Sequence, residues 1–361
     1  MEIHISVRSL VEFILRSGDI DNRRAAAPDN AMQEGSRIHR MIQRRMGPEY
    51  QAEVGLKYIY DAGEYEIIVE GRADGIITEN LPEQSVQAAE QMYLDVIEQI
   101  KPEITLLEGK SREDGTEVYL PEKPLQAQSV QKVRVTIDEI KGVFRDLKKM
   151  KDAVPVHLAQ AKCYAYIYAA HNGLEAVRVR MTYCHIETEE IRYFHYDYTY
   201  RELQAWFGDV MKQYRKWSDY HYAWQRKRKA SIKELVFPYS YREGQKELAS
   251  DVYRTIYHKR KLFIEAPTGV GKTISTVFPA VKAMGEDLCE KIFYLTAKTI
   301  TRTVADHTFA LLREHGLQLK SVVLTAKDKI CFMEETECNP EHCPYAKGHY
   351  DRINDAMYDL L

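Results

Sequence analysis

An eight-residue segment in the second half of the chain limits the possible fold more than any other. It reads Ala266-Pro267-Thr268-Gly269-Val270-Gly271-Lys272-Thr273, with alanine where the phosphate-loop pattern usually has its first glycine. An apolar run precedes it and a helical pattern follows. Glycines let backbone N–H groups turn toward phosphate oxygens, and a helix N-terminus favours anions. The segment therefore predicts a nucleotide site in which Lys272 neutralises the β- and γ-phosphates and Thr273 ligates Mg²⁺.

Strand-like and helical patterns alternate around this loop. Strands are predicted over residues 262–265, 291–296 and 321–325, and helices over residues 245–257, 273–284 and 301–315. Such alternation is typical of a parallel sheet covered by helices. Residues 237–327 therefore predict part of a RecA-like P-loop α/β domain.

The first half predicts a separate mixed α/β domain over residues 1–225. Period-two alternation indicates one hairpin of residues 54–60 with 65–77 and a second of residues 176–186 with 191–198. A further strand is predicted over residues 133–140. Helical spacing of apolar residues then predicts a helix over residues 156–170. Residues 80–131 read as an insertion that contains a helical stretch over 86–100. The expected fold class is thus α/β with two domains, the first a mixed sheet with flanking helices.

A cationic run, residues 225–229, lies between the two halves and lacks apolar periodicity. We interpret residues 226–236 as a basic linker. The alternative, a solvated helix face inside one domain, remains open, because charge runs are commonly surface.

The composition is that of a globular chain. Of 361 residues, 45% are hydrophobic and 29% charged, which excludes a disordered chain. No run approaches about 18 consecutive apolar residues, and residues 1–10 lack a secretion signal, so we expect a cytoplasmic protein without a membrane partner. Because 51 Lys and Arg oppose 54 Asp and Glu, for a net charge of −3, nucleic-acid binding would depend on local basic patches.

A second candidate site lies in the first half. Asp74 ends one predicted strand, and Glu139-Ile140-Lys141 ends another. Residues two apart in a strand face the same side, so Glu139 and Lys141 project together. A carboxylate pair of Asp74 and Glu139 would suit Mg²⁺ or Mn²⁺, while Lys141 would position a water molecule or stabilise developing charge.

Three of the six cysteines are close in sequence: Cys331, Cys338 and Cys343. Thiolates at such spacing can share one soft metal centre. A zinc site that includes His342 or His349 is the alternative, and unliganded surface cysteines are a further one.

The Asp, then Glu-x-Lys arrangement resembles that of PD-(D/E)XK nucleases. With His39 on a predicted helix before Gly47-Pro48, and with Gln160 and Tyr164 after the lysine strand, it resembles the RecB-like branch, which includes CRISPR-associated exonucleases. The resemblance covers about residues 35–203, interrupted by the insertion. It implies that His39 is an extra metal ligand and that Gln160 and Tyr164 are accessory catalytic residues.

The second half resembles the XPD/DinG group of superfamily 2 helicases. Residues 265–273 resemble motif I, residues 237–245 resemble the adenine-recognising element, and residues 294–299 resemble motif Ia, which touches the DNA backbone. The resemblance implies ATP as the bound nucleotide, with Gln245 and Arg242 on its adenine side.

The same resemblance implies a 4Fe-4S domain that starts at residues 328–361. Its ligands would be the three clustered cysteines, with a fourth expected beyond residue 361, so the chain is expected to be truncated.

Residues 133–139 also look like a Walker B strand, but that strand follows the phosphate loop in these helicases. No apolar run ending in Asp-Glu-x-His follows Thr273, so we expect this chain to bind ATP yet to hydrolyse it poorly.

Together these patterns and resemblances predict the N-terminal part of an ATP-dependent DNA helicase fused to a metal-dependent DNA nuclease. The resemblance to the XPD/DinG group implies 5′-to-3′ movement. Single-stranded or forked DNA would be its partner, and DNA repair or recombination its setting. One alternative is an ATP-regulated module that holds single-stranded DNA in a non-cutting nuclease-like fold. Another is a zinc-stabilised, ATP-dependent switch protein.

Overall fold

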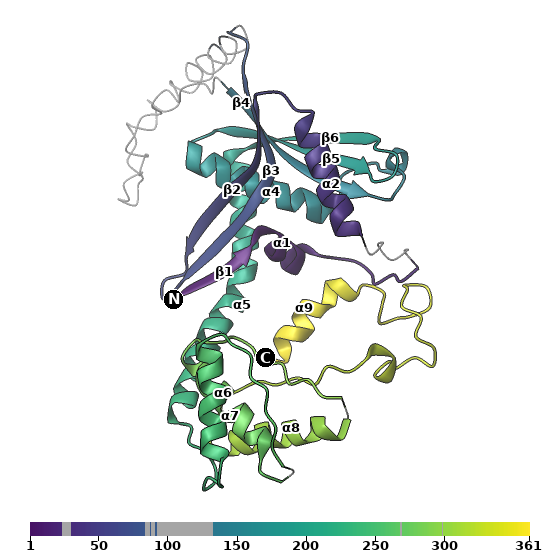
Figure 1. Ribbon diagram of the computed structural model, residues 1–361. Helices are drawn as coiled ribbons and strands as arrows, with labels where there is room; N and C mark the ends of the chain where they lie inside the picture. Colours follow the sequence, from purple (N-terminus) through teal and green to yellow (C-terminus); the bar gives the residue numbers. More distant parts are fainter. Residues whose placement is uncertain (24–29, 84–86, 88–90, 92–132, 268, 298) are drawn as a thin grey trace, which may run out of the picture. The chain divides into compact units, whose positions relative to one another are not determined.

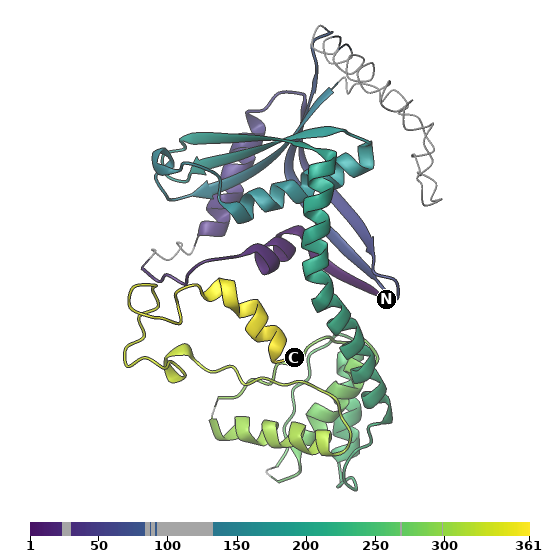
Figure 2. The ribbon, with the colours of Figure 1, turned by 180° about the vertical axis from the view of Figure 1, so that it is seen from behind.

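The computed structural model describes residues 1–23, 30–83, 87, 91, 133–267, 269–297 and 299–361 (Figures 1 and 2). Thr268 and most of the insertion predicted over 80–131, including most of its helical stretch 86–100, lie outside these residues. The chain forms two compact units. The first unit is residues 1–215 with 337–361, and the second unit is residues 216–336.

The first unit is built on a mixed sheet. Its described strands are β1 (Glu2–Ser6), β2 (Tyr50–Asp61), β3 (Glu66–Asn80), β4 (Val133–Val143), β5 (Ala176–His185) and β6 (Ile191–Thr199). Their order is β1-β3-β4-β5-β6, with β2 also paired to β3. The predicted hairpins β2–β3 and β5–β6 and the strand β4 are confirmed. Strand β1 was not predicted.

The long strand β3 pairs with two different strands, β1 and β4, along one edge, and we call the gap between them the fork. Strand β2 pairs antiparallel along most of β3, so β1 and β4 share the opposite edge. There β1 pairs in parallel with Glu66–Glu70, and β4 pairs antiparallel from Gly75 to Asn80. Residues 71–74 lie between the two. Beyond Asp138, β4 leaves β3 and pairs with β5 alone among the described strands, which opens the sheet beside Asp74.

Helices cover both faces of this sheet (Figure 1). Helix α2 (Ala31–Arg44) packs its buried Ile38 and Ile42, one turn apart, against Ile140 of β4. Helix α4 (Pro155–Asn172) contacts Lys141, which neighbours Ile140 and therefore points to the other face. The prediction of a helix over residues 156–170 is confirmed. Helix α1 (Val7–Leu15) buries Val7, Leu10 and Val11.

The last residues of the chain pack against the segment that follows α1. Backbone bonds join Ile20 N to Ala346 O at 3.0 Å and Asn22 N to Cys338 O at 2.8 Å. Helix α9 (His349–Asp359) follows, and its Asn354 Nδ2 donates to Phe13 O at 2.6 Å. Residues 337–361 therefore belong to the first unit.

The second unit has a helical core. It contains residues 216–234 of α5 (Tyr200–Glu234) together with α6 (Gln245–Tyr257), α7 (Lys272–Gly285), α8 (Thr299–Glu314) and a short 3-10 turn, η2 (Lys327–Lys329). Ile232 of α5 packs with Val281 of α7 and Leu312 of α8. The three predicted helices are confirmed with end shifts of at most two residues.

The three strands predicted in this half are not formed. Residues 262–265, 291–296 and 321–325 have no strand pairing, and Phe263, Leu295 and Leu324 are more than 80% exposed. Apolar β-branched and aromatic runs favour strands, but a strand exists only where a neighbour bonds its backbone. Among the described residues these runs have no such neighbour, so the expected parallel sheet of a RecA-like domain is absent there.

The structure also differs from the linker that we expected over residues 226–236. Helix α5 continues through the basic run to Glu234. Arg, Lys, Gln and Ala are strong helix formers, and the helix beyond the run is held by Ile232 in the core of the second unit. The segment is therefore mostly helix, as in the alternative interpretation.

None of the helices described here combines the length and apolarity that a membrane span requires.

Candidate active site

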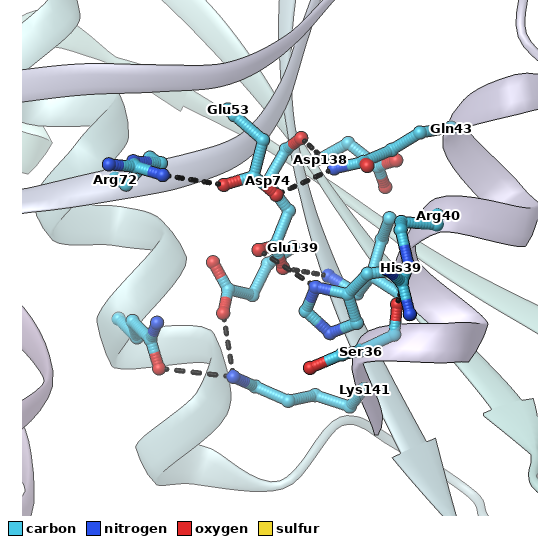
Figure 3. Close-up of polar contacts among 12 residues, drawn as sticks. Ser36, His39, Arg40, Gln43, Glu53, Arg72, Asp74, Asp138, Glu139 and Lys141 are labelled. Atoms are coloured by element: carbon cyan, nitrogen blue, oxygen red, sulfur yellow. Dashed lines mark hydrogen bonds and ion pairs between the residues drawn. The ribbon is translucent and has the colours of Figure 1, made fainter. Parts of the chain in front are cut away.

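The fork in the sheet brings together side chains from strands β2, β3 and β4 and from helices α2 and α4, and Figure 3 shows Glu53 of β2 beside Asp74. Asp74 lies on β3 at the open edge, and Glu139 and Lys141 lie on β4 just beyond the point where it leaves β3. His39 comes from α2 and Gln160 from α4. All six residues predicted for this site are brought together: these five and Tyr164, which follows Gln160 by one turn of α4.

Asp74 occupies the gap that the diverging strand leaves. Its Oδ2 accepts a hydrogen bond of 2.7 Å from the backbone N–H of Ile140, which β3 no longer pairs. Its Oδ1 lies 3.2 Å from Nδ1 of His39. Burial alone would lower the pKa of His39, but the hydrogen bond and charge of Asp74 outweigh it and raise the pKa. Asp74 therefore fixes both the strand and the imidazole.

Glu139 and Lys141 form an ion pair in which the carboxylate is buried and the ammonium is partly exposed. Lys141 Nζ lies 2.7 Å from Glu139 Oε1 and donates at 3.2 Å to Gln160 Oε1. The Glu139 side chain is 1% exposed, and its Oε2 has no hydrogen-bond partner among the described residues. Burial, then the charge of Asp74, raises the pKa of Glu139, and Lys141 opposes this rise.

Tyr164 lies one turn after Gln160 on α4 and is 3% exposed. A Cβ on Gly71 would come within 2.7 Å of the Tyr164 hydroxyl, so the glycine provides the space for this ring beside the fork. Burial, then the charge of Glu139, raises the pKa of Tyr164, while its hydrogen bond to Gln160 opposes the rise. The phenol is thus a neutral hydrogen-bonding group next to the ion pair.

A buried network supports the site from the other face of the sheet. Asp138, next to Glu139, is fully buried and receives a bidentate pair from Arg180, with N–O distances of 2.9 and 2.8 Å. Thr182 and Tyr50 also donate to its carboxylate. Sequence reasoning did not assign a role to Asp138, Arg180 or Tyr50. An Asp directly before the Glu-x-Lys pattern would have been the signal.

Glu53 of β2 was also missed. It lies opposite Asp74 in the hairpin, between the pairs Ala52↔Gly75 and Val54↔Ala73. Ligand atoms of His39, Glu53 and Asp74 all lie within 4.8 Å of one another, and they are the group of this kind found among the described residues. Its distance from the Glu-x-Lys pattern in sequence left no local signal.

The donor set fits a hard divalent cation. Carboxylate oxygens from Asp74 and Glu53 with one imidazole nitrogen are ligands that Mg²⁺ or Mn²⁺ accepts. The Oε2 of Glu139 is buried and has no hydrogen-bond partner among the described residues, and a cation beside it would stabilise the ionised carboxylate.

The phosphate loop has its own set of contacts in the second unit. Lys272 Nζ donates to the carbonyls of Ala266 at 2.6 Å and Pro267 at 3.0 Å, so it lies over the loop. Gln245 Nε2 donates to Val270 O at 2.9 Å, and Arg242 Nη1 donates to Gly269 O at 2.6 Å.

Gly271, immediately before α7, has a φ of 78°, and a Cβ there would lie 2.3 Å from Gln245 Nε2. Gln245 and Arg242 therefore hold the loop backbone. Thr273 follows Lys272 in the first turn of α7 and is half-buried.

The clustered cysteines are divided between the units. Cys338 and Cys343 are buried in the first unit, and Cys331 belongs to the second. His342 Nδ1 lies 2.9 Å from Asn339 Oδ1, which also accepts from two backbone N–H groups. Shared metal ligation by the three cysteines stays a prediction.

Comparison with known proteins finds one relative that is similar in sequence to part of the chain. It is 32% identical over 127 residues to a protein of Methanocaldococcus jannaschii named "Probable ATP-dependent helicase MJ0942". The match covers 35% of this chain and 19% of that relative, so it spans about a fifth of the relative's length. No protein-family model matches the chain.

One solved structure, of SSO0001, is 14% identical with a TM-score of 0.29, covering 59% of this chain and 76% of that one. A similarity at this level does not indicate a shared fold.

Proposed function

We propose that this chain combines a divalent-metal DNA nuclease site with part of an ATP-dependent DNA helicase. The observation that carries the nuclease proposal is the constellation of Asp74, Glu139 and Lys141 at the sheet fork, with His39 and Gln160 in contact with it. The observation that supports the helicase proposal is the relative named as an ATP-dependent helicase, together with the phosphate loop.

In the nuclease proposal, His39, Asp74 and Glu139 hold the cation. A bound Mg²⁺ or Mn²⁺ would polarise the scissile phosphate and make a water molecule acidic enough to attack it. Lys141 places its ammonium beside Glu139 and offers positive charge to a phosphate oxygen as charge develops. Gln160 holds Lys141 at 3.2 Å, and Tyr164 fixes Gln160, so both position the lysine.

In the helicase proposal, residues 269–273 cradle the phosphates of ATP, and Thr268 belongs to the same loop. Lys272 would exchange its two loop carbonyls for β- and γ-phosphate oxygens, and Thr273 would reach the Mg²⁺ that accompanies ATP. Gln245 and Arg242 hydrogen-bond to the loop backbone, and in this proposal they would also contact the adenine of ATP.

The finer assignment follows the sequence resemblance. We propose placement near the XPD/DinG group, 5′-to-3′ movement on single-stranded or forked DNA, a role in repair or recombination, and a 4Fe-4S cluster held by Cys331, Cys338 and Cys343. The nuclease would span residues 1–225, and the ATP-binding part residues 237–327.

The test is cleavage of end-labelled single-stranded DNA in Mn²⁺. We expect cleavage by the wild type and a loss of about 100-fold or more in Lys141→Ala, because a preorganised charge at the reacting phosphate is removed. Lys149→Ala, at a lysine that is 85% exposed, is the matched control and should cleave normally. Binding of DNA by the wild type without metal-dependent cleavage would instead favour the non-cutting alternative.

A further inference from the structure

Glu53 has a backbone conformation that is rare in a strand. Its φ is 56°, in the left-handed region that L side chains seldom adopt. The flanking residues keep a regular register with β3, so the distortion is confined to the position opposite Asp74. Such conformations persist where surrounding structure imposes them, and they are concentrated at functional sites.

Helix α2 holds the Glu53 carboxylate beside Asp74. Gln43 lies one helical turn after His39, on the same face of α2. Its Nε2 donates to Glu53 Oε1 and to the backbone carbonyl of Asp74, both at 2.9 Å. Arg72 Nη1 lies 3.5 Å from the other oxygen, Oε2. One amide therefore links the two acidic residues, as Figure 3 shows.

Exposure changes steadily across the site. The side chain of Glu53 is 45% exposed, His39 27%, Asp74 13% and Glu139 1%. Glu53 thus lies on the solvent side of the site, and the unpartnered Oε2 of Glu139 lies on the buried side. Ligand atoms of Glu53 and Asp74 lie within 4.8 Å of each other, and two carboxylates so close repel one another unless a cation lies between them.

We infer that Glu53 is a further ligand of the divalent cation at this site, on its solvent side, and that Gln43 positions it. The inference rests on the proposed nuclease site. It assigns to the strained residue of β2 a ligand role beyond the His39, Asp74 and Glu139 set, and it explains why Glu53 and Asp74 share one hydrogen-bond donor.

The test is binding of Mn²⁺ alone to the full chain, followed by electron paramagnetic resonance of free Mn²⁺. Four variants are compared with the wild type: Glu53→Gln, Glu53→Gly, Asp74→Asn and Glu66→Gln. We expect both Glu53 variants to bind about tenfold more weakly or worse, as changes around metal sites typically do. Glu66, an exposed carboxylate on the same hairpin, is the matched control and should bind like the wild type.

Thermal unfolding separates a ligand role from a structural one. Glycine accepts the left-handed conformation, so Glu53→Gly should melt at or above the wild-type temperature while it loses affinity. If both Glu53 variants bind Mn²⁺ like the wild type while Asp74→Asn does not, the inference is overturned and the nuclease proposal stands. If the wild type does not bind Mn²⁺, or Asp74→Asn binds normally, both are overturned.

Discussion

Glu139 shows how the fold sets the chemistry of one residue. Its carboxylate is removed from water, faces the charge of Asp74 and is neutralised in part by Lys141 at 2.7 Å. A cation ligand must be deprotonated, so a carboxylate with a raised pKa binds metal in competition with protons. The residue is thus poised between a protonated state without metal and an ionised state with it.

This shift predicts a pH-dependent stability in EDTA. The pKa of Glu139 rises from 4.5 to about 8 in the folded chain, so folded Glu139 keeps a proton that the unfolded chain loses between these values. The stabilisation is complete below pH 4.5 and is lost as the pH rises toward 8. Thermal unfolding from pH 5 to 8 should therefore show a decline in wild type that is smaller in Glu139→Gln. Equal declines of the unfolding temperature with pH in the two proteins would contradict a raised pKa of Glu139.

The buried pair of Asp138 and Arg180 predicts that substitution of Arg180 lowers the free energy of unfolding much more than substitution of Arg178 on the same strand. Arg180→Met would leave the fully buried Asp138 without its bidentate partner, and breaking a buried pair costs about 3–5 kcal/mol. Arg178→Met breaks a pair with Asp197, which is 70% exposed, and should cost about 1 kcal/mol or less. Urea unfolding of the two variants measures the difference, and equal losses would contradict the buried network.

At the scale of elements, the sequence patterns predicted those hairpins and helices whose formation depends on residues close together in the chain. Alternation predicted the β2–β3 and β5–β6 hairpins, and helical periodicity predicted α4, α6, α7 and α8. Local patterns could not predict pairing between distant segments. Glu2 of β1 pairs with Glu66 of β3, and the fork that brings His39 to Asp74 exists only in the assembled sheet. The same non-local requirement explains why the apolar runs at 262–265, 291–296 and 321–325 are not strands.

The continuous helix α5 predicts sensitivity to proline at Ala230, the residue directly after the basic run. Ala230→Pro should lower the free energy of unfolding by about 3 kcal/mol, because proline removes a backbone hydrogen bond and clashes with the preceding turn. Circular dichroism at 222 nm and urea unfolding measure the loss, with Ala230→Gln as the control. A flexible linker would tolerate both changes equally, and that result would contradict the helix.

At the scale of the whole molecule, two sites with different chemistry belong to different compact units. The carboxylate site lies within residues 1–215, and the phosphate loop within residues 216–336. Each is assembled from contacts inside its own unit, as for Gln245 with Val270 and Lys141 with Gln160. The two activities should therefore be separable by mutation.

Lys272→Ala tests this separation. It removes the ammonium that would contact the triphosphate, and hydrogen bonds to charged groups are worth about 1.5–3 kcal/mol. Affinity for a fluorescent ATP analogue should thus fall about tenfold or more, while Mn²⁺-dependent cleavage of DNA is unchanged. Glu139→Gln should give the reverse pattern. Loss of both activities in either variant, with folding intact, would contradict independent sites.

The most direct measurement of the central claim is anomalous diffraction from a crystal of the full chain soaked in Mn²⁺. The account predicts a manganese peak at the sheet fork, within ligand distance of Asp74, Glu139 and His39, with Glu53 on its solvent side. A manganese peak elsewhere, with these carboxylates left unliganded at saturating Mn²⁺, would contradict it.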